Sequence, residues 1–168
     1  MKKTLITAAV ALVAAIATPA MANDFTGPRV GVTAGFDKQG GKSGASLGGV
    51  AGYDLRVAGP VRAGVEVTVA DSTTDDGFAH SNLDLGANLR VGVKVLDRVL
   101  VFGKVGYART DYGFAGGLKT TQEGVRFGGG AELAVTDHVY TTVEYDRTEY
   151  GNGVAGRDQV LGGVGFRF

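Results

Sequence analysis

Residues 82–94 read NLDLGANLRVGVK and carry the pattern on which the fold depends. One face of an alternating register is apolar and holds Leu83, Leu85, Ala87, Leu89, Val91 and Val93. The opposite face is small or polar and holds Asp84, Gly86, Asn88, Arg90 and Gly92. Alternation with a period of two over this length indicates a β-strand whose faces meet two different environments.

The same alternation recurs along the chain, and we expect strands at 28–37, 45–55, 61–70, 82–94, 99–109, 121–133, 139–148 and 158–168. Most have about ten residues, as a strand that crosses a bilayer needs. The connections 38–44, 71–81, 110–120 and 149–157 are long and polar, whereas 56–60, 95–98 and 134–138 are short. Outer-membrane barrels have this asymmetry, with short periplasmic turns and longer external loops. The sequence therefore predicts an all-β fold, an eight-stranded antiparallel up-and-down transmembrane β-barrel with both termini periplasmic.

The second face carries charges near the middle of its strands. The bases are Arg29, Arg62, Arg90, Lys104, Arg126 and Arg167, and the acids are Asp54, Glu66, Asp84, Glu132, Glu144 and Asp146. Equal numbers favour an enclosed interior in which the charges are paired, because an unpaired buried charge is costly. We predict a lumen polar network of Arg62, Glu66, Asp84, Arg90, Lys104, Arg126, Glu132, Glu144, Asp146 and Arg167. The 29 glycines, against 3 prolines, leave room for long arginine side chains in a narrow barrel.

Aromatic residues on the apolar face gather near the strand ends. Phe36, Tyr107 and Tyr145 lie toward the outer ends, and Tyr53, Phe166 and Phe168 lie toward the inner ends. Rings at the two edges of an apolar band are typical of the bilayer interfaces. In a soluble sandwich the rings would instead gather at mid-strand, so we predict that these six residues form two aromatic girdles.

Residues 1–22 read as a cleaved secretory signal peptide. Lys2 and Lys3 precede an apolar run of 13 residues, Leu5–Ala17, and a small-residue site ends at Ala22. The alternative, a retained helical anchor, is disfavoured because the run is too short to span a bilayer. We expect cleavage between Ala22 and Asn23, and residues 23–168 to form the outer-membrane β-barrel domain.

The charge balance and the cysteine count restrict the partners and the sources of stability. The chain has 17 bases and 17 acids, and loss of Lys2 and Lys3 leaves a net charge of −2. A nucleic-acid partner is not expected, because phosphate binding needs a basic excess or patch. The absence of cysteine excludes disulfides.

Over nearly the whole mature segment the chain resembles the small eight-stranded outer-membrane barrels of the opacity-protein and OmpA/OmpX-like porin family. The resemblance rests on VGVTAGFD, LGGVAGYDLRV, VFGKVGYA, FGGGAELAV, VYTTVEYDRTEYG and a last strand that ends in Phe168. It implies that the barrel-assembly machinery reads Val164, Phe166 and Phe168 as an assembly signal. Because nothing follows Phe168, a peptidoglycan-binding domain is not expected.

No motif predicts a catalytic, cofactor or metal site. GGKSG at 40–44 lacks the preceding glycine of a phosphate-binding loop, since Phe36 occupies that position. DSTTDDG at 71–77 has Asn82 where a calcium loop needs Glu, so a solvated acidic loop is favoured over weak divalent-cation bridging to lipopolysaccharide. His80-Ser81 and His138 lack the partners of a nucleophilic site, and we expect no enzyme.

We expect a structural and surface role in the envelope, with outer-membrane lipid and lipopolysaccharide as partners. One alternative is a small or gated porin-like channel, although eight strands leave a lumen just wide enough for side chains to fill. Another is an adhesin or host-interaction protein that uses the loop around 110–120, and a third is a lipid-modifying enzyme.

Overall fold

The chain folds into a closed eight-stranded antiparallel barrel, as the sequence predicts. The computed structural model describes residues 24–72, 82–113, 119–151, 153 and 155–168. The predicted signal peptide and the cleavage position at Ala22 and Asn23 lie outside the described residues, as do His80 and Ser81. Among the residues described, no helix is long and apolar enough to cross a membrane.

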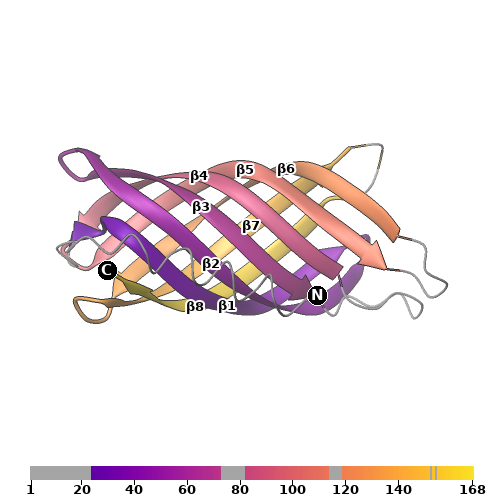
Figure 1. Ribbon diagram of the computed structural model, residues 1–168, viewed down its shortest axis with the longest axis horizontal. Coiled ribbons are helices and arrows are strands. Elements are labelled where there is room, and N and C mark those ends of the chain that lie inside the picture. Colours follow the sequence, from indigo (N-terminus) through magenta and orange to yellow (C-terminus); the bar gives the residue numbers. More distant parts are fainter. Residues whose placement is uncertain (1–23, 73–81, 114–118, 152, 154) are drawn as a thin grey trace.

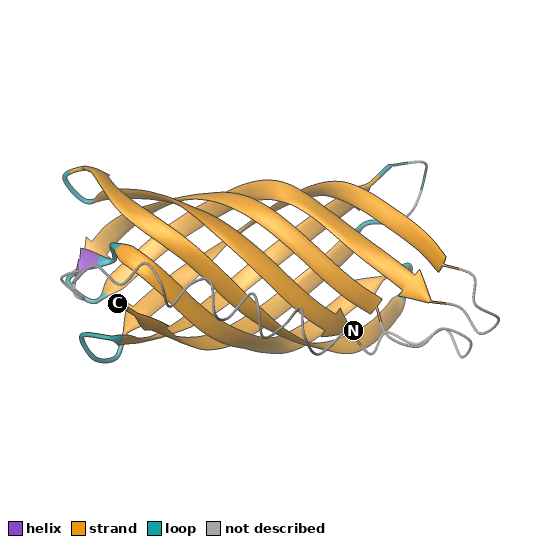
Figure 2. Ribbon diagram, viewed as in Figure 1, coloured by secondary structure: helices purple, strands orange, loops and turns teal. Residues whose placement is uncertain are grey.

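The strands follow one another around the barrel in chain order, and β8 closes it against β1 (Figure 1). They are β1 (Gly27–Gln39), β2 (Lys42–Ala58), β3 (Val61–Ser72), β4 (Asn82–Leu96), β5 (Val99–Gly113), β6 (Lys119–Ala134), β7 (Val139–Tyr150) and β8 (Arg157–Arg167). Strands make up nearly all of the described chain (Figure 2). Closure gives every strand two neighbours, so the barrel has no open edge to leave backbone groups unpaired in lipid.

The two ends of the barrel differ. One end, which we call the terminal end, holds the start of β1, the end of β8 and the connections at 59–60, 97–98 and 135–138. The opposite end, the loop end, holds the connections at 40–41, 73–81, 114–118 and 151–156.

Two expectations about lengths are wrong. The strands have 11–17 residues rather than about ten, because polar residues at their ends continue the ladder instead of starting loops. The predicted long connection 38–44 is a two-residue turn, Gly40–Gly41, with φ of 57° and 86°. Two consecutive glycines permit the left-handed conformations that a tight hairpin turn requires, so Gln39 pairs directly with Lys42.

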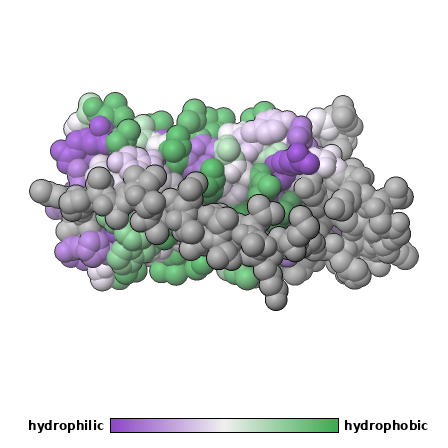
Figure 3. Space-filling model, viewed as in Figure 1, coloured by the Kyte–Doolittle hydropathy of each residue, from purple (hydrophilic) through white to green (hydrophobic). Residues whose placement is uncertain are grey.

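The surface of the barrel is apolar around its middle (Figure 3). Large apolar side chains stand exposed on this wall, including Val65 at 55% and Leu89 at 62%. The buried positions are mostly polar or charged, the reverse of a soluble protein. Such a surface fits a hydrocarbon environment outside and an enclosed polar interior.

Candidate functional site

The interior of the barrel is an ionic core. Seven bases and seven acids are buried, with relative exposures of 7% or less. They are Arg29, Arg62, Arg90, Lys104, Arg126, Arg157 and Arg167 with Asp37, Asp54, Glu66, Asp84, Glu132, Glu144 and Asp146. All ten residues of the predicted lumen polar network lie in this set. Asp37 and Arg157 extend it beyond the sequence analysis, because both stand at strand ends next to segments that were read as loops.

Nine of these residues form one connected chain of ion pairs, which we call the basal network. Arg90 pairs with Glu132 at 2.7 Å, and Glu132 pairs with Arg167 at 2.8 Å. Arg167 in turn reaches Asp54 at 3.0 Å, and Asp54 accepts from Arg29 at 3.0 Å. The nine residues come from all eight strands, so the network ties opposite walls of the barrel together.

Lys104 is the hub at the other end of the basal network. Its Nζ lies 3.3 Å from Glu66, 2.5 Å from Glu144 and 2.9 Å from Asp146. Glu66 links this hub to the rest of the network, because it also accepts from Arg29 at 2.5 Å. One ammonium therefore contacts three carboxylates. Among these three, only Glu66 also forms an ion pair with an arginine.

A second set of charges, the upper network, lies nearer the loop end. Arg126 contacts both carboxylate oxygens of Asp84, at 2.7 and 2.8 Å. Arg157 pairs with Asp37 at 2.9 Å and lies 3.5 Å from Asp84. Thr148 accepts a further hydrogen bond from Arg126 at 3.0 Å. The guanidinium groups thus lie between carboxylates and hydroxyls in a fully buried setting.

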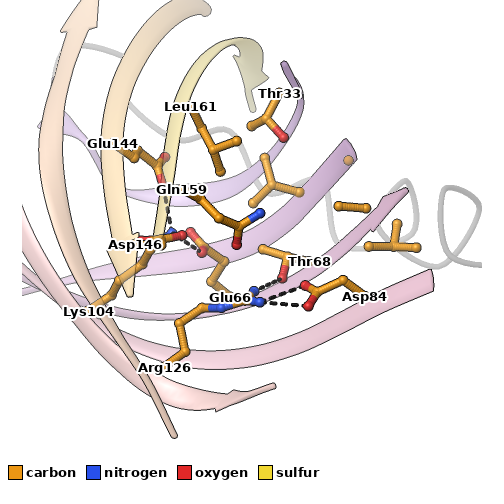
Figure 4. A pocket seen from close by; sticks show the side chains of 14 residues that line it. Thr33, Glu66, Thr68, Asp84, Lys104, Arg126, Glu144, Asp146, Gln159 and Leu161 are labelled. Atoms are coloured by element: carbon orange, nitrogen blue, oxygen red, sulfur yellow. Dashed lines mark hydrogen bonds and ion pairs between the residues drawn. The ribbon is translucent and has the colours of Figure 1, made fainter. Parts of the chain in front are cut away.

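The space between the two networks is almost filled. Figure 4 shows Lys104 with Glu144 on one side and Arg126 with Asp84 on the other. A cavity of about 20 Å³ remains between them, which is room for roughly one water molecule. Between the two networks, the described side chains therefore leave no space for a solute larger than water.

Apolar side chains close the terminal end below the basal network. Phe25, Leu100 and Ala134 form a buried cluster there. Arg90 stacks over the Phe102 ring with its guanidinium carbon 3.7 Å from the ring centroid, a cation–π contact. Phe25 precedes β1 and has a φ of 53°, an uncommon value for a residue with a side chain. Sequence analysis missed this plug because Phe25 lies outside any alternating segment.

Asp24 holds the segment that carries Phe25. Its carboxylate pairs with both Arg56 and Arg62, and Arg62 Nε also donates to the Asp24 carbonyl at 2.5 Å. Burial would raise the pKa of Asp24, but the two guanidinium groups lower it below its ordinary value. We call this group the Asp24 latch. Arg62, which the sequence analysis assigned to the lumen network, therefore lies at the rim of the terminal end and belongs to neither of the two networks.

The predicted aromatic girdles lie on the outer face. Phe36, Tyr107 and Tyr145 are exposed toward the loop end, at 74%, 51% and 48%. At the terminal end, Phe166 is 41% exposed, and Tyr53 and Phe168 are half-buried. These positions agree with interfacial rings, and the assignment to bilayer interfaces stays a prediction.

The last strand is held at its end. The Arg167 amide donates to the His138 carbonyl at 2.7 Å, and the Phe168 amide donates to Pro28 at 3.0 Å. Phe166 stacks on the His138 ring at a centroid separation of 5.3 Å and meets Phe168 edge-on at 5.0 Å. Of the proposed assembly signal, Val164 and Phe166 are exposed on β8, whereas Phe168 follows the strand and is half-buried.

Within the described ranges, no three His, Cys, Asp or Glu side chains form a group that could hold a metal ion. GGKSG at 40–44 forms the Gly40–Gly41 turn and the start of β2. Asp71 lies near the end of β3, and the rest of the acidic segment from residue 73 lies outside the described residues.

Residues 8–168 match the family described as outer membrane protein beta-barrel domain. The chain belongs to this family. No curated protein matches it in a direct comparison.

Several solved outer-membrane barrels share the fold. Neisserial surface protein A is 17% identical with a TM-score of 0.59, over 84% of this chain and 96% of that chain. The N-terminal barrel domain of OprF from Pseudomonas aeruginosa is 15% identical with a TM-score of 0.60, over 85% and 99%. Ail, the attachment invasion locus protein of Yersinia pestis, is 12% identical with a TM-score of 0.58, over 85% and 97%.

Proposed function

We propose that this outer-membrane barrel has a structural and surface role in the envelope and performs no catalysis. The observation that carries the proposal is the filled lumen, in which two ionic networks leave a cavity of only about 20 Å³. A barrel closed in this way offers its outer wall and its loop end to other molecules, rather than a path through its centre.

The proposed orientation places the terminal end in the periplasm and the loop end outside. Short turns at one end and longer connections at the other are the arrangement of outer-membrane barrels. Export through a signal peptide cleaved between Ala22 and Asn23 would deliver the chain to the periplasm. The assembly machinery would then read Val164 and Phe166, which are exposed on β8, together with Phe168, which follows that strand. Outer-membrane lipid would surround the apolar wall, and lipopolysaccharide would meet its external rim.

Deletion of the gene tests the structural role. We expect the deletion strain to become more permeable to a hydrophobic fluorescent probe and more sensitive to detergent. Expression of the full chain should restore the barrier. If the barrier is unchanged by deletion under envelope stress, the structural role is wrong.

The channel alternative is tested on the purified barrel. Recordings in planar bilayers should show no discrete conductance steps, because both networks bridge the lumen. Steps that disappear after the same sample is unfolded by heat would favour a channel and contradict the proposal. A heat-dependent shift in mobility on a gel would establish that the recorded sample was folded.

A further inference from the structure

The charges of the basal network do not balance. Its bases are Arg29, Arg90, Lys104 and Arg167, and its acids are Asp54, Glu66, Glu132, Glu144 and Asp146. Arg62 does not make up the difference, because Asp24 holds it at the rim of the terminal end. Four bases against five acids leave the network with a net charge of −1 when every group is ionised.

The upper network has bases and acids in equal number and supplies no spare cation from the described residues. Arg126 contacts both oxygens of Asp84 at 2.7 and 2.8 Å, and Arg157 pairs with Asp37 at 2.9 Å. The surplus negative charge therefore stays among the basal carboxylates, which are at most 7% exposed. An uncompensated charge in such a setting is costly, and a carboxylate there becomes neutral by taking up a proton.

The ion pairs place the surplus charge at Glu144 and Asp146. The other three acids of the basal network each contact at least one arginine. Glu144 and Asp146 instead share one cation among the described residues, the ammonium of Lys104, which lies 2.5 and 2.9 Å from them. Two carboxylates on one ammonium leave one negative charge without a counter-ion.

The hydrogen bonds of these two acids point to the same place. Glu144 Oε1 accepts a hydrogen bond from Thr142 Oγ1 at 3.1 Å, whereas Asp146 Oδ1 is buried without a hydrogen-bond partner in the described part of the chain. Gly128 on the neighbouring strand leaves room for this oxygen, since a Cβ there would lie 2.1 Å from it. A buried anionic oxygen without a donor is costly, but the same oxygen with a proton belongs to a neutral group.

The surroundings of the pair favour a proton over a metal ion. Glu144 and Asp146 line the cavity of about 20 Å³, which has room for roughly one water molecule and none for a hydrated metal ion (Figure 4). Lys104 already places a positive charge against both carboxylates and would repel a metal ion beside it. A proton occupies no volume and bonds directly to a carboxylate oxygen. The other charged residues around the cavity are Glu66 of β3, Asp84 of β4 and Arg126 of β6, and β1, β2 and β8 present uncharged residues to it.

We propose that Glu144 and Asp146 share one exchangeable proton at neutral pH, which makes the basal network electrically neutral. The unfolded chain does not hold this proton, because ordinary carboxyl groups have lost theirs above about pH 5. Folding therefore takes up one proton, and the free energy of unfolding falls as the pH rises from about 5 to about 8. The barrel thus gains stability in a mildly acidic medium, whichever of its ends faces outward.

Urea unfolding of the mature barrel in detergent micelles, followed by the heat-dependent gel shift at several pH values, tests this site. Asp146→Asn keeps the shape of the side chain and leaves four acids for four bases, so its folding takes up no proton. The folding constant of wild type relative to this variant should rise about tenfold for each pH unit of acidification between about pH 7.5 and 5.5, the effect of one bound proton. Glu144→Gln should give the same slope, because removal of either acid balances the network. The control is Asp97→Asn, a fully exposed carboxylate at a turn, against which the wild-type constant should not change with pH.

A constant ratio of wild type to Asp146→Asn over this pH range would overturn the proposal. So would a wild-type stability that rises with sodium concentration at fixed ionic strength, which would assign the surplus charge to a metal ion. If neither lumen variant folds, the infrared spectrum of the wild-type barrel at pH 7 decides the matter. It should contain a protonated carboxyl band that shifts when the carboxyl carbons of aspartate and glutamate are labelled with ¹³C, and absence of that band would equally overturn the proposal.

Discussion

Replacement of Lys104 by Met tests the ionic core at its hub. Met preserves most of the length and the volume of the side chain but removes the charge. Glu66 keeps Arg29 at 2.5 Å after the change, whereas Glu144 and Asp146 lose the cation that lies 2.5 and 2.9 Å from them. All of these side chains are at most 6% exposed, so water cannot take the place of the ammonium.

The loss in free energy of unfolding can be estimated from the least costly way to neutralise a carboxylate that has lost its cation. Protonation of one carboxyl at pH 7 costs roughly 4 kcal/mol, at 1.4 kcal/mol for each of about three pH units above its ordinary pKa. Removal of one partner from a buried ion pair costs a similar amount, about 3–5 kcal/mol. We therefore expect Lys104→Met to lower the free energy of unfolding by about 4 kcal/mol at pH 7.

The same reasoning fixes the pH dependence of this difference. The folded variant holds a proton that its unfolded chain does not hold, so its stability relative to wild type rises as the pH falls. At pH 5 the protonation costs only about 1.5 kcal/mol, and the gap between variant and wild type should shrink accordingly.

Urea unfolding in detergent micelles, monitored by the heat-dependent gel shift, measures both values. Lys94→Met is the control, because Lys94 lies 3.6 Å from the fully exposed Asp97 at a turn, and we expect a change below about 0.5 kcal/mol. Adding Asp146→Asn to Lys104→Met should recover about half of the loss, since one stranded charge is gone. A loss under about 1 kcal/mol at pH 7, or an equal loss at pH 5 and pH 7, would refute the paired and sealed core.

Three further changes test the plug, the latch and the last residue. Phe25→Ala should lower the free energy of unfolding by about 3 kcal/mol, because the ring is buried. Phe36→Ala, on the outer wall, should have a smaller effect, and equal losses in urea unfolding would argue against a packed plug. Asp24→Asn should cost about 1 kcal/mol at pH 7. The contribution is present above the ordinary pKa of 3.8 and is lost as the pH falls through the lowered folded value, so wild type and variant should converge as the pH falls below 3.8 in the same assay. Deletion of Phe168 should slow assembly in cells more than it lowers final stability, and an unchanged rate in pulse-chase gels would show that the ring is not read.

The sequence could place charges inside the barrel because strand parity assigns every second residue to one face. Asp84 and Arg90 share a face in any register, so their burial follows from the alternation alone. Their partners do not follow from it. Arg90 pairs with Glu132 and Asp84 with Arg126, and these contacts depend on how far each strand is staggered around a closed barrel. No local pattern encodes that stagger.

Features outside the alternation were the ones missed. Gly40–Gly41 reads as part of a polar loop until pairing extends to Gln39 and Lys42. Phe25 enters the lumen from a left-handed turn, and a single residue has no period to detect.

The high glycine content is what allows the charged side chains to pack inside the barrel. A Cβ at Gly128 would lie 2.1 Å from Asp146 Oδ1, and a Cβ at Gly86 would lie 2.9 Å from Arg126 Nη1. A Cβ at Gly52 would lie 3.1 Å from Arg29 Nη2. Charged side chains therefore lie against bare backbone of a nearby strand, and the interior above the apolar plug is filled mostly by polar and charged side chains. Arg29, Arg126 and Asp146 are each held both by ion-pair partners and by such a backbone contact, so a conducting rearrangement would have to move backbone as well as ion pairs. The two networks are for this reason better suited to stabilise a rigid cylinder than to switch, and recognition is left to the outer rim.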